Sequence, residues 1–232
     1  MRRNLPLIIC IVLVIAFIAV LPFSVTIVPI AQVEAVEAAE KFDAPSFVAG
    51  IFDSKLVPTV QEKAVELATI LSQFKVNDKG IAKKDDLIPI AEQNGHITVG
   101  EAHVYMVKGK GVVTEVDTKS RVKTMSVQLE GYDGPIKVRL YTGPRIPSDE
   151  TSVRDAVGFI NFGDFRSQTE YGKVANELNK LIVKQVLGNV DVNTLVGKTI
   201  EFTGAIGVRT FNLLDIDLSQ VVVVPVSLKV VE

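Results

Sequence analysis

ITVGEAHVYMVKGKGVVTEVD, residues 97–117, is followed closely by RVKTMSVQLEGYDGPIKVRLYTGP, residues 121–144. The second stretch alternates between two faces, with Val122, Thr124, Ser126 and Gln128 on one and Met125, Val127 and Leu129 on the other. Such alternation is typical of a sheet with one buried face. Turn-forming residues at 117–120 and 131–134 interrupt the pattern. The sequence therefore predicts three strands joined by two hairpin turns.

Two further strands are predicted near the C-terminus, in KTIEFTGAIGV (residues 198–208) and VVVVPVSLKVV (residues 221–231). Pro225 interrupts the last run. Proline cannot donate a backbone hydrogen bond, so its presence indicates a sheet edge or a bulge at that position.

A helix is predicted between the third and fourth strands. Ser167 and Glu170 have the spacing of a capping box, and Gly188 ends the run. Between them, apolar residues recur at helical spacing: Tyr171, Val174, Ala175, Leu178, Ile182 and Val186. Three meandering strands, a helix and two more strands is the order of an OB barrel, in which the helix caps one end. We therefore expect a mainly β fold with α, an OB-like five-stranded barrel with a capping helix, although other α+β folds fit the same order.

The N-terminus predicts one transmembrane helix. Arg2 and Arg3 precede an uncharged run from Asn4 to Gln32, which is longer than the roughly 20 residues that a span requires. The two arginines predict a cytoplasmic N-terminus and an extracytoplasmic C-terminal domain, attached to the cytoplasmic membrane in a single pass. A retained anchor is favoured over a cleaved signal, because the nearest small-residue cleavage sites lie well beyond the apolar run. Lipidation of Cys10 is the least favoured reading.

These features divide the chain into an anchor or uncleaved signal over residues 1–31, a linker over residues 32–46, and an extracytoplasmic OB-like domain over residues 47–232. The domain should begin with an additional amphipathic helix in KLVPTVQEKAVELATILSQFKVN, residues 55–77, with Pro58 in its first turn. One apolar stripe is expected to cover the core of the domain: Val60, Ala64, Leu67, Leu71 and Phe74.

Composition and motifs argue against several classes of function. The net charge of −2 and pI near 5.8 provide no basic field for a row of phosphates, so no nucleic-acid partner is expected. Cys10 is the only cysteine, which excludes an internal disulfide. His96 and His103 lack the spacing of a helical metal pair, and we expect no metal, no cofactor and no catalytic residue. Asp215 and Asp217 would share a strand face. They could form an acid/base pair or bind a cation, but we favour a solvated strand surface.

The stretch SVRDAVGFINFGDFRSQTEY, residues 152–171, has two interpretations. In the favoured one it is core, with three phenylalanines buried against the barrel at roughly 1.5–3 kcal/mol each: Phe159, Phe162 and Phe165. Arg154 and Asp155 then make separate contacts, because neighbouring residues do not share a helical face. Arg154 is expected to bond backbone carbonyls or Asp164, and Asp155 is expected to bond helix N–H groups. In the other interpretation a polar set lines a groove and binds a sugar or a partner loop: Arg154, Asp155, Asn161, Asp164, Arg166 and Gln168.

Three segments of the chain carry a resemblance: residues 142–179, LVGKTIEFTGAI at 195–206, and VVPVSLKV at 223–230. The most specific part is a series of ten residues: Gly143, Pro144, Arg154, Asp155, Ala156, Phe162, Phe165, Gln168, Tyr171 and Asn179. With these features the chain beyond residue 45 resembles a bacterial family of unknown function described as predicted periplasmic lipoproteins. The resemblance implies an OB-like fold and, since members are often encoded beside ribose-type sugar ABC transporters, an accessory role near such a system. The chain departs from the family description at Cys10, where no convincing lipobox occurs because Ile9 is not small.

The resulting hypothesis is a membrane-anchored extracytoplasmic accessory or binding module associated with a sugar ABC transport system, whose components would be its partners. The alternative is a structural envelope or assembly protein with no small-molecule ligand. An extracytoplasmic hydrolase is less favoured, because the sequence contains no motif that would position a nucleophile.

Overall fold

The computed structural model describes residues 13–14, 17 and 42–231. The residues from Asp43 onward form one compact unit. Among the described residues, no helix has the length and apolar character needed to cross a bilayer. The predicted span, residues 4–32, lies almost entirely outside the described residues, so the anchor, its orientation and the state of Cys10 stay predictions.

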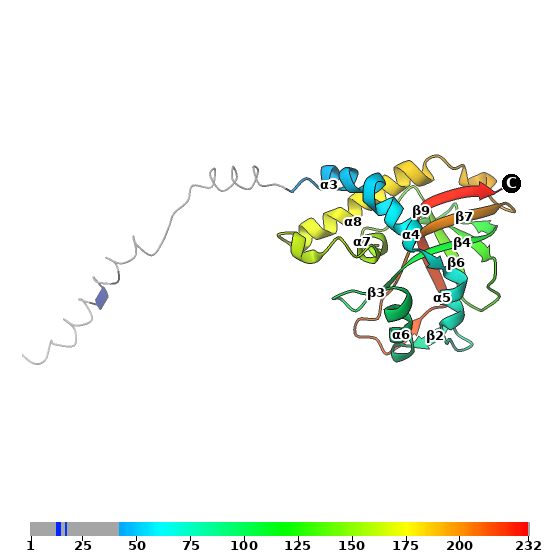
Figure 1. The fold of residues 1–232 in the computed structure, drawn as a ribbon, viewed down its shortest axis with the longest axis horizontal. Helices are drawn as coiled ribbons and strands as arrows, with labels where there is room; N and C mark the ends of the chain where they lie inside the picture. Colours follow the sequence, from blue (N-terminus) through cyan, green and yellow to red (C-terminus); the bar gives the residue numbers. More distant parts are fainter. Residues whose placement is uncertain (1–12, 15–16, 18–41, 232) are drawn as a thin grey trace, which may run out of the picture. The chain divides into compact units, whose positions relative to one another are not determined.

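Five strands close into a barrel (Figure 1): β4 (His103–Val116), β5 (Lys123–Leu129), β6 (Lys137–Gly143), β7 (Thr199–Val208) and β9 (Gln220–Val231). β4, β5 and β6 form an antiparallel meander, and β6 pairs with β9 in parallel. β7 pairs antiparallel with both β9 and β4, which closes the barrel. This order is that of an OB fold, and the predicted five-stranded barrel is confirmed.

The predicted strand details also agree with the structure. Along β5, Met125 is fully buried inside the barrel, whereas Ser126 is half-buried and Gln128 is exposed on the outer face. Pro225 of β9 stands opposite Gly204 of β7, where the pairing register of the two strands shifts. Because β9 pairs on both sides, Pro225 marks a bulge and not a sheet edge.

Helix α8 (Gln168–Ile182) is the predicted capping helix. Its N-cap is Ser167, whose Oγ accepts a hydrogen bond from the Glu170 N–H at 3.2 Å. The Glu170 carboxylate accepts from the N–H of Arg166 at 3.1 Å, one residue before the position that a standard capping box uses. α8 continues into a π-helical turn, η4 (Val183–Leu187), which Gly188 follows. The predicted helix and its limits are therefore confirmed.

The prediction of one continuous helix over residues 55–77 is wrong. Two helices, α4 (Val57–Lys63) and α5 (Leu67–Gln73), are separated by extended Ala64 and by the short strand β1 (Val65–Glu66). β1 pairs in parallel with β4, so the barrel supplies hydrogen bonds that replace those of a helical turn. All five residues of the predicted stripe are nevertheless buried.

The remaining elements surround the barrel. α3 (Ala44–Ile51) begins at Asp43, its N-cap, so residues 44–46 of the predicted linker are helical; the π-helical turn η2 (Phe52–Leu56) follows. Figure 1 shows α3, the short helix α7 (Ser152–Ala156) and α8 together on one side of the barrel. α5 and α6 (Lys84–Asn94) lie on another side. The other short elements are β2 (Ile81–Lys83), β3 (His96–Ile97), β8 (Asp215–Asp217), and the 3₁₀ turns η3 (Phe162–Asp164) and η5 (Val192–Thr194).

Candidate functional site

Two of the predicted site residues form a buried cluster between α7 and α8. Arg154 Nε lies 2.7 Å from Asp155 Oδ1, and the two side chains are only 8% and 9% exposed. The same carboxylate accepts hydrogen bonds from the Tyr171 hydroxyl at 2.9 Å and from Thr151 Oγ1 at 2.7 Å. Arg154 also donates to the carbonyl oxygen of Tyr171 at 3.0 Å, and its guanidinium carbon lies 3.5 Å from the Tyr171 ring centroid. The cluster thus ties α7 to α8.

This geometry corrects one prediction and confirms another. Arg154 and Asp155 do not make separate contacts, because α7 is only five residues long and the flexible arginine side chain reaches the adjacent carboxylate. The expected bond from Arg154 to a backbone carbonyl is present, at Tyr171. Burial, and then the nearby Asp155 carboxylate, raise the pKa of Tyr171 to about 12. At neutral pH the phenol therefore keeps the proton that it donates to Asp155.

The other four predicted site residues lie at the surface. Asn161 donates its backbone N–H to Asp164 Oδ2 at 3.2 Å, which caps the η3 turn. Arg166 and Gln168 are exposed at the start of α8. None of the six predicted residues lines either of the two clefts described below. Ligand binding by the set therefore stays a prediction.

The three phenylalanines do not form a buried plug, so that prediction is wrong. Phe162 is 53% exposed, and Phe159 and Phe165 are only half-buried. The Phe165 ring packs edge-on against Phe47 of α3 at 5.7 Å between centroids, and Phe162 packs in the same way on Tyr171 at 5.6 Å. The segment is a short 3₁₀ turn flanked by extended residues, so a three-residue spacing does not place the rings on one helical face.

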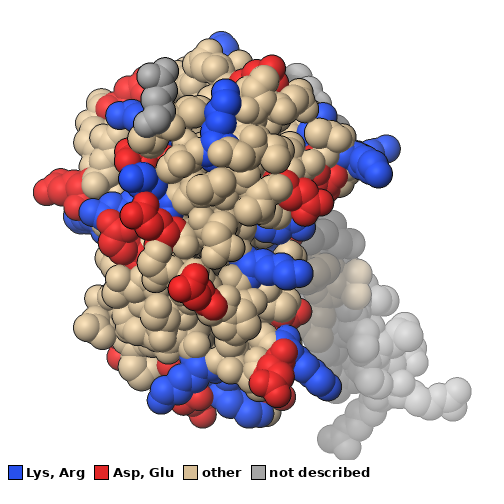
Figure 2. Space-filling view, turned by 90° about the vertical axis from the view of Figure 1, so that its right-hand side faces the viewer, with Lys and Arg blue, Asp and Glu red and all other residues tan. Residues whose placement is uncertain are grey.

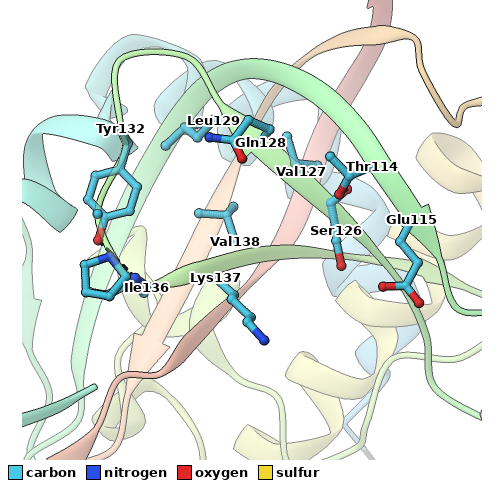
Figure 3. Close-up of a pocket in the computed structure, with 12 residues that line it drawn as sticks. Thr114, Glu115, Ser126, Val127, Gln128, Leu129, Tyr132, Ile136, Lys137 and Val138 are labelled. Carbon is cyan, nitrogen blue, oxygen red and sulfur yellow. Dashed lines mark hydrogen bonds between the residues drawn. The ribbon is translucent and has the colours of Figure 1, made fainter. Parts of the chain in front are cut away.

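A cleft of about 320 Å³, here called the outer-face cleft, lies on the outside of β5 and β6 (Figure 3). Figure 3 shows Tyr132 at one end and Glu115 at the other. The Tyr132 hydroxyl accepts a hydrogen bond from the Ile136 N–H at 3.2 Å, which holds the turn between the two strands. The polar side chains of the lining come from three consecutive strands: Thr114, Glu115, Ser126, Gln128 and Lys137.

The outer-face cleft has a mixed and largely neutral lining. Thr114, Ser126 and Gln128 can each donate and accept hydrogen bonds, and one cation and one carboxylate flank them. β5 and β6 are the second and third barrel strands, whose outer face is the ligand-binding face of OB folds. The strand alternation places Ser126 and Gln128 on the face opposite Met125, but no motif in the sequence marks them as site residues.

A second cleft, here called the α8 cleft, has a volume of about 590 Å³ and lies between α8 and residues 144–148. Asn179, only 5% exposed, donates hydrogen bonds to the carbonyl oxygens of Glu150 at 2.8 Å and Pro147 at 3.3 Å. These bonds hold the loop against the helix. Three apolar side chains line the cleft: Pro144, Ile146 and Val183. The neutral polar side chains are Ser148, Asn176 and Asn179, and the charged ones are Arg145, Lys173, Glu177 and Lys180.

Within the described part of the chain, no group of three His, Cys, Asp or Glu residues is arranged to hold a metal ion. Asp215 and Asp217 are exposed on β8. Lys83 Nζ lies 2.5 Å from Asp215 Oδ1, and Asp217 Oδ1 accepts a hydrogen bond from the Ser219 N–H at 2.9 Å. The favoured interpretation of this pair as a solvated strand face is confirmed.

His103, at the start of β4, predicts a pH dependence of stability. The side chain is 1% exposed, and burial, followed by the charge of Lys84, lowers its pKa below the ordinary value of 6.5. The unfolded chain therefore takes up a proton near pH 6.5 while the folded chain does not. The free energy of unfolding should fall as the pH decreases below that value, by at most about 1.4 kcal/mol per pH unit from this group.

Urea unfolding of wild type and His103→Gln, from about pH 7.5 to about pH 5, tests this expectation. Other groups titrate equally in both proteins, so the wild type should lose more stability than the variant over this range. Equal losses would show that His103 is protonated as readily in the folded chain as in the unfolded one.

Comparison with known proteins now identifies the family. Residues 11–229 match the model of a family described as predicted periplasmic lipoprotein (DUF2291). The chain belongs to this family. The resemblance carried by residues 142–179 and the last two barrel strands is thereby confirmed. Membership indicates a membrane-associated, extracytoplasmic location, and the function of this lipoprotein family is unknown.

The fold of this family member also has a counterpart among solved structures. The crystal structure of an OB-fold protein from Thermotoga maritima matches with a TM-score of 0.59 and 15% identity, over 83% of this chain and 100% of that chain. At this level of identity the likeness shows the fold alone. Among curated proteins, none matches the chain.

Proposed function

We propose that this member of the predicted periplasmic lipoprotein family is a membrane-anchored binding module that works beside a sugar ABC transport system. In this proposal the uncharged run of residues 4–32 is a single-pass anchor with its N-terminus in the cytoplasm. The OB domain, which follows it, then lies where an importer meets its substrate. The ligand is a neutral saccharide bound in the outer-face cleft.

The lining of the outer-face cleft carries this proposal. Saccharide hydroxyls both donate and accept hydrogen bonds, and Thr114, Ser126 and Gln128 offer groups of both kinds. The volume of about 320 Å³ lies at the lower end of the roughly 300–1,000 Å³ typical of small-molecule sites. OB folds bind oligosaccharides or oligonucleotides on this face, and the net charge of −2 favours the uncharged ligand.

A second candidate function, in assembly, is favoured by one surface. Four apolar side chains, here called the apolar loop surface, are strongly exposed on two loops: Val99 (104%), Phe211 (60%), Leu213 (47%) and Leu214 (81%). The loops lie side by side, because Thr210 Oγ1 donates to the carbonyl of Glu101. Exposed apolar patches mark protein interfaces, so this surface supports docking onto an apolar groove of a protein partner.

Calorimetric titration of the full-length protein with a panel of neutral mono- and disaccharides tests the first function. We expect one of them to bind, and Gln128→Ala to weaken that binding by about tenfold, since it removes hydrogen bonds to the ligand. The matched control is Gln61→Ala, which changes an exposed glutamine of α4 outside the outer-face cleft.

Absence of binding across the panel, or an equal effect of both variants, would contradict saccharide binding at this cleft. Copurification from membranes separates the two functions. If transporter subunits copurify with wild type but not with a Phe211→Ser, Leu214→Ser variant that still binds saccharide, the apolar loop surface is the docking surface.

A further inference from the structure

The α8 cleft carries an excess of positive charge. Its lining has three cations, Arg145, Lys173 and Lys180, against one carboxylate, Glu177. Lys180 Nζ already lies 2.6 Å from Glu177 Oε1. Neither Arg145 nor Lys173 makes an ion pair or a side-chain hydrogen bond with another residue in the described part of the chain. The residues that the structure describes therefore supply no counter-charge to these two cations of the cleft.

This excess of positive charge is local to the α8 cleft. On the face shown in Figure 2, Lys and Arg side chains are interspersed with Asp and Glu. The chain as a whole has a net charge of −2. The α8 cleft, with two unneutralised cations, therefore attracts an anion at short range. Salt screens such an attraction beyond about 10 Å at 0.1 M ionic strength.

The walls of the α8 cleft are held in place before any ligand arrives. Asn179 bonds two carbonyl oxygens of the segment 147–150, so the loop cannot separate from α8 without exposing buried polar groups. Ile146, 5% exposed, together with Pro144 and Val183 supplies apolar surface. A preorganised wall reduces the entropic cost of binding.

We infer that the α8 cleft is a second binding site, for a small molecule that carries a phosphate or carboxylate group on a compact, partly apolar body. Arg145 offers the planar fork that bonds such groups in a bidentate way, and Lys173 adds a second charge. Ser148 and Asn176 are placed for neutral hydrogen bonds to the ligand body. The volume of about 590 Å³ lies within the roughly 300–1,000 Å³ usual for such sites.

This inference does not rest on the saccharide proposal. The α8 cleft shares no lining residue with the outer-face cleft, and the two clefts differ in charge. Its anionic ligand has two sources with the same chemistry, a free small molecule or the headgroup of a membrane lipid. The experiment therefore needs one arm for each source.

Calorimetric titration of the full-length protein with inorganic phosphate, glucose 6-phosphate, gluconate and uncharged glucose tests the free-anion source. At about 50 mM salt we expect one equivalent of an anionic probe to bind, and Arg145→Gln and Lys173→Gln each to weaken that binding by about tenfold. Lys229→Gln, an exposed lysine of β9 outside the α8 cleft, is the control and should leave it unchanged. The excess of cosedimentation with phosphatidylglycerol vesicles over that with phosphatidylcholine vesicles, which measures retention by the proposed anchor, tests the lipid source.

The outcomes separate as follows. Loss of anionic-probe binding in Arg145→Gln and Lys173→Gln, but not in Lys229→Gln, supports the site and a free ligand. Loss of phosphatidylglycerol cosedimentation in the same two variants, without binding of soluble probes, supports the site with a lipid headgroup. If no anionic probe or vesicle binds, or if all three variants behave alike, the inference is overturned. Both cleft variants change surface side chains, so unchanged unfolding midpoints verify that they fold.

Discussion

Arg154→Met should lower the free energy of unfolding by about 3–5 kcal/mol, the usual cost of removing one partner from a buried ion pair. The substitution leaves the Asp155 carboxylate, whose side chain is 9% exposed, without a cation. Of the described residues, only Tyr171 and Thr151 would still donate to it, through their hydroxyls. The variant also loses the bond to the Tyr171 carbonyl and the stacking on its ring. The measurement is the urea unfolding midpoint and slope of the full-length protein.

The matched control is Arg209→Met, which breaks an arginine–aspartate pair at a similar distance on the surface. Arg209 Nη2 lies 2.9 Å from Asp149 Oδ2, but the two side chains are 69% and 68% exposed, so solvent screening limits the cost to about 1 kcal/mol or less. A double variant, Arg154→Met with Asp155→Leu, should recover part of the lost stability because it removes both buried charges.

Equal losses of unfolding free energy in Arg154→Met and Arg209→Met would contradict the structural role of the buried cluster. An unfolding midpoint that stays unchanged in Arg154→Met while ligand binding is lost would instead support the predicted polar set as a binding site.

Leu178→Ala should lower the free energy of unfolding by about 2–5 kcal/mol, because it deletes a fully buried side chain from the inner face of α8 and leaves a cavity. Phe162→Ala is the contrasting variant. The sequence interpretation of a buried plug implies a loss of about 3–5 kcal/mol for that phenylalanine. The structure leaves its ring 53% exposed with one edge-on contact to Tyr171, so we expect about 1 kcal/mol or less.

Chemical denaturation of both variants beside wild type provides the measurement. A cost for Phe162→Ala as large as that for Leu178→Ala would mean that the phenylalanine is buried in solution, and the plug interpretation would regain its support. A small cost for Leu178→Ala would mean that α8 packs loosely on the rest of the domain.

Features that depend on a few neighbouring residues could be predicted from the sequence. The alternation through Met125 and Gln128 follows from the two-residue period of a strand, whatever surrounds it. Ser167 caps α8 through an amide only three residues away, and Pro225 cannot complete a strand ladder in any fold. The order of these elements then favoured the OB barrel, which other α+β folds with the same order left open until the family resemblance added its support.

Features that depend on residues brought together from distant segments could not be predicted from the sequence. Ala64 leaves the helical conformation because the following strand β1 pairs with β4, some forty residues later, and no local signal marks that break. Arg154 meets Tyr171, and Asn179 meets the carbonyl of Glu150, only after α8 has packed beside α7. Both clefts are likewise built from separate segments. Local periodicity is a property of the backbone, whereas burial, charge pairing and concavity depend on which segments the closed barrel places side by side.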